Sequence, residues 1–364
     1  MITIHTPGSM LGATFDATRW YRPRRIALVC ERVGWVHPSL ATPARRLDLV
    51  REYGDFSIAY TTAVQDRLKH FGDHRGYLAY DRRMGYTFAL GDPVAPPRER
   101  ERILRRFVQQ HRNVAFCQIS RATAEIVQRC NFYVNELGVD SVLPLTEYDF
   151  SGQDKRWLRV AASWISRRGY TICEETAENV GLDQIESVSL AWRATRAVKR
   201  KEVRFLNRPL VLADEPETRR FYLFDDQRQL LAFVFFDPLF RDGRLLGYVA
   251  CSKRRHPDAP PYAEHAIMKH AIETFQREGC QEFRLGLSPL AHIEDREFGA
   301  NWFVSRAFRS AFESRLINRR FYNVQGHAEY KRRFRGREEK VYFATRSRCD
   351  PLQLAALVKI CKVV

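Results

Sequence analysis

The spacing of hydrophobic and polar residues changes several times along the chain, between the strand period of two and the longer helical period. Residues 1–41 carry scattered Pro, Gly and Arg without a sustained period, which predicts an irregular N-terminal extension. Thr42-Pro43 is typical of a helix start and predicts a helix through Val50. The pattern then predicts strands at 76–80 and 86–90, a helix at 98–111, a strand at 114–119, a helix at 122–130 and a strand at 132–137.

A similar order of elements follows in the second part of the chain. A basic amphipathic helix is expected at 155–168, and the pattern continues with a strand at 170–173, a helix at 183–200, strands at 221–223, 230–236 and 245–251, a helix at 262–277 and a strand at 282–287. The order of hairpin, strand, helix and strand thus occurs twice. We therefore predict an α+β fold with mixed sheets, divided into domains at 42–201 and 202–364.

Halves built from a hairpin and a helix resemble the acyl-CoA N-acyltransferase-like (GNAT) fold, here in tandem. An acyl-CoA site places a glycine-rich loop of backbone N–H donors at the end of the central strand. The two corresponding loops, 91–97 and 252–261, contain several prolines, and the second has no glycine. Acetyl-CoA is therefore not expected as a substrate, and no cofactor is expected.

Composition adds a preference for polyanions. The 364 residues suffice for two domains, and 60 Lys and Arg against 43 Asp and Glu give a net charge of +17. That excess favours RNA, DNA or an anionic lipid surface, with an arginine-rich solvated surface as the weaker alternative. The longest apolar run, Leu230 to Phe236, is too short to span a bilayer.

The cysteines and histidines do not form a metal-binding pattern. The eight cysteines include no C-x-x-C pair, so buried free thiols in a reducing cytoplasm are expected. His70 and His74 are separated by Gly72, which disfavours one continuous helix and hence a metal site. No signal peptide is visible at the N-terminus.

Four segments in order resemble the cytosolic C-terminal domain of the aminoacyl-phosphatidylglycerol synthases, the lysyl-phosphatidylglycerol synthase or multiple-peptide-resistance-factor family (DUF2156), which has a tandem GNAT fold. The segments are Gly91-Asp92-Pro93-Val94, residues 285–290, residues 321–326 and residues 330–334, and the similarity runs from about residue 50 to 346. The resemblance implies an aminoacyltransferase that moves an aminoacyl group from aminoacyl-tRNA to a hydroxyl of an anionic lipid such as phosphatidylglycerol. It also implies a cytoplasmic protein in peripheral contact with the inner face of the membrane, without the multi-span flippase that many members carry.

Candidate site residues follow from these segments and from their chemistry. Arg254, Lys331 and Arg333 are candidates for binding phosphate or stabilising an oxyanion. Ser288, at a strand end, is a candidate for holding the amino group or the ester, and Phe334 is an aromatic residue among basic ones, as base stacking requires. The substrate-binding candidates are completed by Asp92, which would shape the cleft or bind tRNA, and Asp258.

Two positions depart from the family pattern. Cys251 stands where the family usually has a strand-end aspartate, and His265 stands where an acidic residue is frequent. The candidate catalytic groups beside Arg254 are then His265, with an expected pKa near the working pH, and the adjacent Glu264. The alternative for His265 is a purely structural role on its helix. The departures leave two other functions open: a related transferase with a peptide or small-metabolite acceptor, and a non-catalytic RNA- or membrane-binding protein on a degenerate GNAT fold.

Overall fold

The computed structural model describes residues 40, 42–195, 202–320, 322–346 and 350–362. The predicted extension at 1–41, the end of the helix predicted at 183–200 and Phe321 of the third resembling segment therefore lie wholly or almost wholly outside the described residues. Thr42 caps the first described helix through its side chain, which accepts from the backbone N–H of Arg45 at 3.4 Å, and Pro43 occupies the first turn. The predicted helix start is confirmed.

All the elements predicted from residue 42 to 287 are present, with ends shifted by a few residues. Up to residue 194 the elements are α2 (Pro43–Tyr53), α3 (Ala59–Val64), β1 (Lys69–Asp73), β2 (Gly76–Arg83), β3 (Tyr86–Val94), α4 (Pro97–Gln110), β4 (Val114–Ile119), α5 (Arg121–Arg129), β5 (Tyr133–Pro144), α6 (Arg156–Arg167), β6 (Thr171–Glu174), α7 (Ala177–Val180) and α8 (Leu182–Ala194). From residue 219 they are β7 (Arg219–Phe224), β8 (Leu230–Arg241), β9 (Arg244–Arg255), α9 (Ala263–Arg277), β10 (Glu282–Pro289), α10 (Trp302–Glu313), α11 (Arg315–Arg320), α12 (Val324–Arg332), β11 (Arg337–Thr345) and α13 (Pro351–Ile360).

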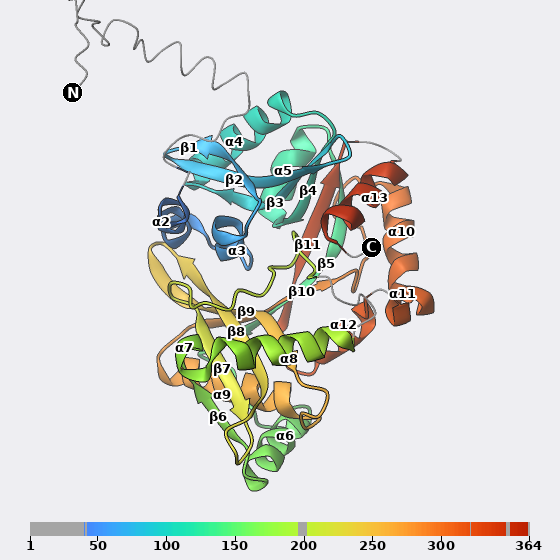
Figure 1. Ribbon diagram of the computed structural model, residues 1–364. Helices are drawn as coiled ribbons and strands as arrows, with labels where there is room; N and C mark the ends of the chain where they lie inside the picture. The colour runs from blue at the N-terminus through green and yellow to red at the C-terminus, as the bar shows by residue number, and fades with distance from the viewer. Residues whose placement is uncertain (1–39, 41, 196–201, 321, 347–349, 363–364) are drawn as a thin grey trace, which may run out of the picture. The chain divides into compact units, whose positions relative to one another are not determined.

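The described strands form one mixed sheet in the order β1-β2-β3-β4-β11-β5-β10-β9-β8-β7-β6 (Figure 1). The pairs β3/β4 and β9/β10 are parallel, and the other neighbours are antiparallel. The α+β fold class with a mixed sheet is therefore confirmed. Strands from before and after residue 201 pair with each other in this sheet. Strand β6 pairs with β7, and β11 inserts between β4 and β5. The division into two domains at that residue stays a prediction.

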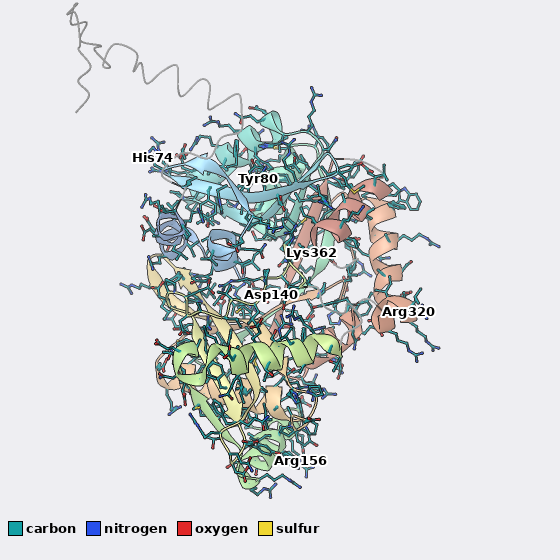
Figure 2. All side chains as sticks on the ribbon, viewed as in Figure 1. His74, Tyr80, Asp140, Arg156, Arg320 and Lys362 are labelled. Carbon is teal, nitrogen blue, oxygen red and sulfur yellow. The ribbon has the colours of Figure 1, made fainter. Side chains whose placement is uncertain are left out.

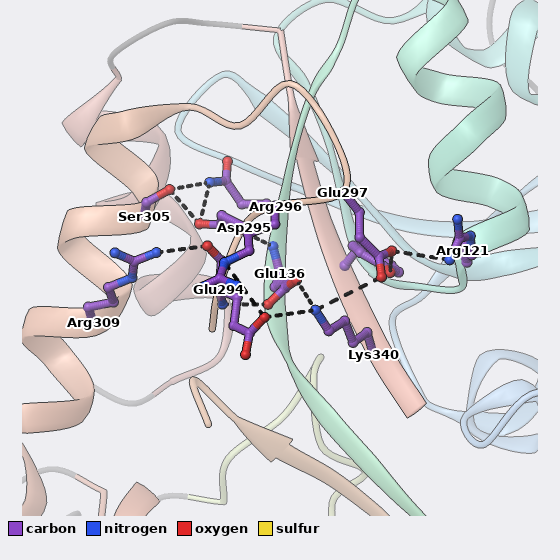
Figure 3. Close-up of polar contacts among 11 residues, drawn as sticks. Arg121, Glu136, Glu294, Asp295, Arg296, Glu297, Ser305, Arg309 and Lys340 are labelled. Atoms are coloured by element: carbon purple, nitrogen blue, oxygen red, sulfur yellow. Dashed lines mark hydrogen bonds and ion pairs between the residues drawn. The ribbon is translucent and has the colours of Figure 1, made fainter. Parts of the chain in front are cut away.

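Strand β11 is anchored to β5 by charge as well as by backbone pairing. Lys340 of β11 lies 2.6 Å from the carboxylate of Glu136 on β5, which is almost fully buried, and 3.9 Å from that of Glu297 (Figure 3). Arg121, at the start of α5, reaches the same Glu297 at 3.4 Å. The contact of Lys340 with Glu136 ties β11 to a strand 204 residues earlier in the chain.

The two faces of β7, β8 and β9 are covered by different helices. Helices α9 and α6 pack on the face that includes Phe221, Val234 and Phe236. Helices α7 and α8 pack on the opposite face, with Tyr222 and Phe233. Strand β8 is buried on both faces along its length except at its last residue, which explains the unbroken apolar run from Leu230 to Phe236. No described helix has the length and apolar character needed to cross a bilayer.

Gly247 sets the close approach of β9 to β10, and its replacement is our first prediction. A Cβ at this position would overlap the backbone carbonyl of Glu282, its partner in the parallel pair. Gly247→Ala should therefore lower the free energy of unfolding by about 1–3 kcal/mol, because the backbone has to move apart. Urea denaturation measures the change, with Gly299→Ala as the control, since a Cβ at Gly299 meets open space. Equal stabilities of the two variants would contradict the close approach.

Candidate active site

Strands β9 and β10 separate halfway along their length. Their parallel pairing runs from Gly247 and Glu282 to Val249 and Arg284, whereas β9 continues to Arg255 paired with β8. Cys251 lies at a bulge in β9, because Ala250 pairs with Phe236 and Ser252 with Phe235. Bulges beside such an opening re-aim neighbouring side chains. Beyond Val249 and Arg284 the two strands no longer pair with each other, and we call this unpaired part of the sheet the splay.

Lys331, from the end of α12, reaches into the splay. Its side chain is 6% exposed, and its Nζ donates to the backbone carbonyls of Gly286 at 2.7 Å and Leu287 at 2.6 Å, both on β10. Gly286 has φ +76° and lies in an irregular stretch of the β10–β5 pairing. A Cβ at Gly286 would stand 3.8 Å from Nζ of Lys331, which is an ordinary contact. Glycine is therefore favoured here by the positive φ rather than by a lack of room for a side chain.

The environment of Lys331 lowers the pKa of its ammonium to about 7. Burial is the main cause, the charge of Lys253 on β9 acts in the same direction, and the carboxylate of Asp140 on β5 opposes both. A neutral amine carries two N–H bonds and one lone pair. Because two carbonyls accept the two N–H bonds, the lone pair is left for a third partner, which is the arrangement of a general base.

Asp140 is a site residue that the sequence patterns missed. It lies on β5 opposite Leu287 of β10 and Glu339 of β11, and it is 4% exposed, near the centre of the view in Figure 2. Its Oδ2 accepts a short hydrogen bond from Ser57, while its Oδ1 is buried without a partner among the described residues. Arg284 stands 3.8 Å away but is shared with Glu282 and Glu339. The available signal was a carboxylate in a short segment that otherwise reads as a strand, between Val139 and Val142-Leu143.

His265 and Glu264 lie on α9, on the splay side of the sheet. The ring of His265 contacts the rings of Trp157 at 4.0 Å and Tyr330 at 4.5 Å between centroids, and both ring nitrogens are buried without hydrogen-bond partners among the described residues. Burial first, and then the positive charges of Lys253, Arg333 and Arg255, lower its pKa to about 3. The ring is thus neutral at pH 7, which corrects the expected pKa near the working pH. A general-base role for His265 remains only a prediction, and this environment disfavours it.

Arg254 lies on the other face of the sheet from Glu264 and His265. It is in register with Phe233, stacks on Trp192 of α8 at 3.8 Å and pairs with Glu202 at 2.8 Å. Lys253 is in register with Val234 and places its Nζ 4.1 Å from the ring of Tyr330, on the splay side. The structure therefore does not bring Arg254 together with the other two catalytic candidates, because side chains alternate along a strand.

The remaining basic and aromatic candidates lie around α12. Arg333 is 4.8 Å from the ring of Trp157, is half exposed and pairs with Glu329 at 3.5 Å. Phe334 is fully buried in the core, and its carbonyl accepts from the hydroxyl of Tyr148 at 2.8 Å, so its ring is not presented for base stacking. Arg255 reaches Glu264 at 3.9 Å, and both Arg255 and Arg333 act electrostatically on His265; we call the region around these two arginines the mouth of the splay.

Of the three remaining candidates, two are buried in strands and one is exposed in a loop. Asp92 is buried at the end of β3 and accepts from the backbone N–H of Ser120 at 2.9 Å, which ties it to the start of α5. Ser288 is buried on β10 opposite Val139. Asp258 is highly exposed in the loop after β9, 3.4 Å from His256. The substrate-binding roles of these three stay predictions.

Cys251 lies close to Asp237, a buried carboxylate on the neighbouring strand β8. Its thiol donates to the carbonyl of Phe235 at 3.3 Å, and burial raises its pKa well above the ordinary value, with Asp237 acting in the same direction. Asp237 is paired with Arg208 at 2.5 Å, and these residues border a cavity of about 10 Å³. Cys251 is thus a packed thiol, and the nearby carboxylate already has a cationic partner.

Comparison with known proteins places this geometry in a family. Residues 47–345 match the family described as "Phosphatidylglycerol lysyltransferase, C-terminal". The phosphatidylglycerol lysyltransferase of Bacillus subtilis (strain 168) is 22% identical over 313 residues, which cover 84% of this chain and 35% of that protein. The chain therefore spans about a third of the length of this curated relative.

Two solved structures have a similar fold. The structure of L-PGS from Bacillus licheniformis has a TM-score of 0.72 at 18% identity, covering 90% of this chain and 97% of that chain. The C-terminal domain (DUF2156) of a putative lysylphosphatidylglycerol synthetase from Agrobacterium fabrum has a TM-score of 0.69 at 20% identity, covering 88% and 98%. The predicted resemblance is confirmed, and the chain belongs to the family of phosphatidylglycerol lysyltransferase C-terminal domains.

Proposed function

We propose that this chain transfers an aminoacyl group from aminoacyl-tRNA to a hydroxyl of phosphatidylglycerol, with the splay as its active site. The observation that carries the proposal is Lys331, a buried lysine with a pKa of about 7 whose Nζ is oriented by two backbone carbonyls. The family to which the chain belongs is named for lysyl transfer to phosphatidylglycerol, which supports the reaction class.

Lys331 would act as the general base. The aminoacyl ester is already activated, so the acceptor hydroxyl has only to lose its proton as its oxygen attacks the ester carbonyl carbon. The proton passes to the lone pair of Nζ, and the tetrahedral intermediate then collapses by breaking the bond to the ribose oxygen of the tRNA. Nζ returns the proton to that oxygen. No cofactor is needed for this balance.

The edge of β9 would stabilise the oxyanion. Beyond Val249 the edge that faces β10 has left the parallel ladder, so backbone N–H groups there are available to the oxygen of the tetrahedral intermediate. The bulge at Cys251 lies in this stretch. Prolines of the following loop do not interfere, because they come after residue 256.

Asp140 would hold the α-amino group of the transferred amino acid. Its free Oδ1 is buried within electrostatic reach of Lys331, and an ammonium group is a partner that such an oxygen requires. This role would restore a carboxylate to the site although Cys251 and His265 replace the acidic residues typical of the family. The lipid phosphate would bind at the mouth of the splay, where Arg255 and Arg333 add positive charge.

A transfer assay tests the proposal. Purified protein is mixed with tRNA charged with labelled amino acids, and with phosphatidylglycerol in detergent micelles. We expect label in the lipid fraction that disappears when the charged tRNA is first treated with RNase. Label recovered in peptides or small metabolites from an added extract would indicate the alternative acceptor. If no labelled amino acid is transferred to any acceptor, the transferase proposal is wrong and a binding protein on this fold remains.

A further inference from the structure

Helix α13 has an unusual outer face. Its sequence, Pro-Leu-Gln-Leu-Ala-Ala-Leu-Val-Lys-Ile, contains one charged residue, although one side of the helix is open to solvent. The buried side packs Ala356, Leu357 and Ile360 into the core cluster with Phe343 of β11. The outer side exposes Leu352 to 61% and Val358 to 39%. Single exposed apolar side chains are common on protein surfaces, whereas a group of them on neighbouring helices is typical of a surface that another phase or molecule covers.

Helix α10 packs on the same core cluster and adds an aromatic residue and arginines. Val304 and Phe308 are buried in the cluster, and the opposite stripe, at helical spacing, carries Trp302, Arg306 and Arg309. Trp302 is 69% exposed. In Figure 1, α10 and α13 lie on the same side of the sheet, as their shared core cluster requires.

Helix α11 continues this surface as a basic segment. None of its residues is buried, Leu316 is 58% exposed, and Arg315, Arg319 and Arg320 belong to it; Arg320 projects from the edge of the molecule in Figure 2. Residues 302–320 contain five arginines and one acidic residue, Glu313. In the part of the chain that the structure describes, no carboxylate lies within ion-pair distance of the three α11 arginines or Arg306.

We propose that the exposed side chains of α10, α11 and α13, here called the outer helical surface, dock this protein onto an anionic lipid bilayer. Tryptophan and leucine side chains favour the headgroup boundary, and unpaired arginines favour lipid phosphates, so one surface supplies both contributions. The charge excess and the apolar patch together favour a bilayer over RNA, which gains little from exposed Leu352 and Val358.

The outer helical surface is connected to the splay by hydrogen bonds. The amide of Asn318 on α11 donates to the carbonyl of Phe312 on α10 at 2.8 Å and accepts from the backbone N–H of Gln325 on α12 at 3.1 Å. Gln325 also donates to Phe312 at 3.0 Å. Helix α12 carries Lys331 at its other end, so docking would fix the general base relative to the bilayer that holds the acceptor. This inference rests on the proposed function for its consequence, but not for the binding itself.

Vesicle sedimentation tests the docking directly. The full chain is mixed with vesicles of phosphatidylcholine alone or with about 30% phosphatidylglycerol. Two double variants remove the apolar part (Trp302→Ser, Leu352→Ser) or the basic part (Arg315→Ser, Arg319→Ser). The control variant, Leu190→Ser with Arg156→Ser, removes one exposed leucine and one exposed arginine from α8 and α6. We expect each lost arginine to weaken partitioning onto anionic vesicles by about fivefold. Added salt should also weaken the partitioning of the wild type onto these vesicles, because it screens the charges.

The outcomes separate docking from catalysis. Docking is supported if both surface variants lose vesicle binding, the control keeps it, and the surface variants still transfer label to short-chain phosphatidylglycerol dispersed below its micellar concentration. Equal binding by wild type and the surface variants overturns it, as does a loss of tRNA binding without a loss of vesicle binding. A dimer that becomes a monomer in the surface variants would assign the surface to a second copy. If the wild type binds vesicles but transfers nothing to either lipid, docking stands and the proposed function fails.

Discussion

Lys331→Met should reduce aminoacyl transfer by about 10²–10⁴-fold, the usual contribution of a positioned general base. Methionine has nearly the same length and volume as the lysine side chain, so the packing around α12 is kept, whereas the amine that accepts the proton is lost. Lys331→Arg should be equally inactive, because a guanidinium keeps its proton at all pH values of interest. Single-turnover assays with preformed aminoacyl-tRNA measure both variants, with Lys269→Met on α9 as the matched control.

The pH dependence of the wild type distinguishes a base from a phosphate-binding cation. Because the neutral amine is the active form and its pKa is about 7, the transfer rate should rise with pH, be half-maximal near pH 7 and level off above it. A group that binds phosphate as a cation would show the opposite trend, with the rate falling above pH 7. If Lys331→Arg retains activity, the lysine acts through its charge and the general-base role is wrong.

The same pKa affects stability. Lys331 is neutral in the folded protein above pH 7, whereas an unfolded lysine keeps its proton to about pH 10.4, so the unfolded state binds more protons in this window. The contribution of this side chain therefore opposes folding fully below pH 7 and becomes less unfavourable as the pH rises towards 10. The Lys331→Met variant should show a smaller gain in unfolding free energy over that range than the wild type.

Local patterns predicted most of the strands and helices up to residue 287, because their apolar periods are regular and glycine or proline residues mark their ends; they missed the short elements α3, β1 and α7. They did not predict β11, whose first four residues are charged and whose partners, β4 and β5, lie roughly 200 residues earlier. Its position follows from long-range pairing and from the contact of Lys340 with Glu136, neither of which leaves a local periodic signal.

The candidate site was predicted in part for a similar reason. Lys331 was identified from a basic segment, but its orientation into the splay depends on β9 and β10 separating after Val249, which no single segment encodes. Arg254 and Lys253 are adjacent in sequence, and only strand alternation decides which of them faces α9. Phe334 looked like a stacking residue because it stands among basic residues, yet the packing of α12 buries it.

Asp140→Asn should lower kcat/KM for aminoacyl-tRNA by about 10–100-fold, since a hydrogen bond to a charged group contributes about 1.5–3 kcal/mol. The variant keeps the shape of the side chain and removes the charge that would hold the α-amino group. A second effect follows from the electrostatics: Asp140 favours the protonated form of Lys331, so its neutralisation should lower the pKa of Lys331 and move the half-maximal rate to a pH below 7.

Acetylation of the amino group on the charged tRNA provides the decisive comparison. N-acetylaminoacyl-tRNA lacks the positive charge, so the wild type should use it with the same low kcat/KM that Asp140→Asn shows for the natural substrate. For Asp140→Asn itself, acetylation of the substrate should lower kcat/KM little further. Glu136→Gln is the matched control, because Glu136 lies on the same strand, is almost fully buried and is paired with Lys340 outside the splay. If acetylation weakens the variant as strongly as the wild type, the two effects are independent and Asp140 does not bind the amino group. A shifted pH midpoint without any coupling to acetylation would leave Asp140 as a positioning residue for Lys331 alone.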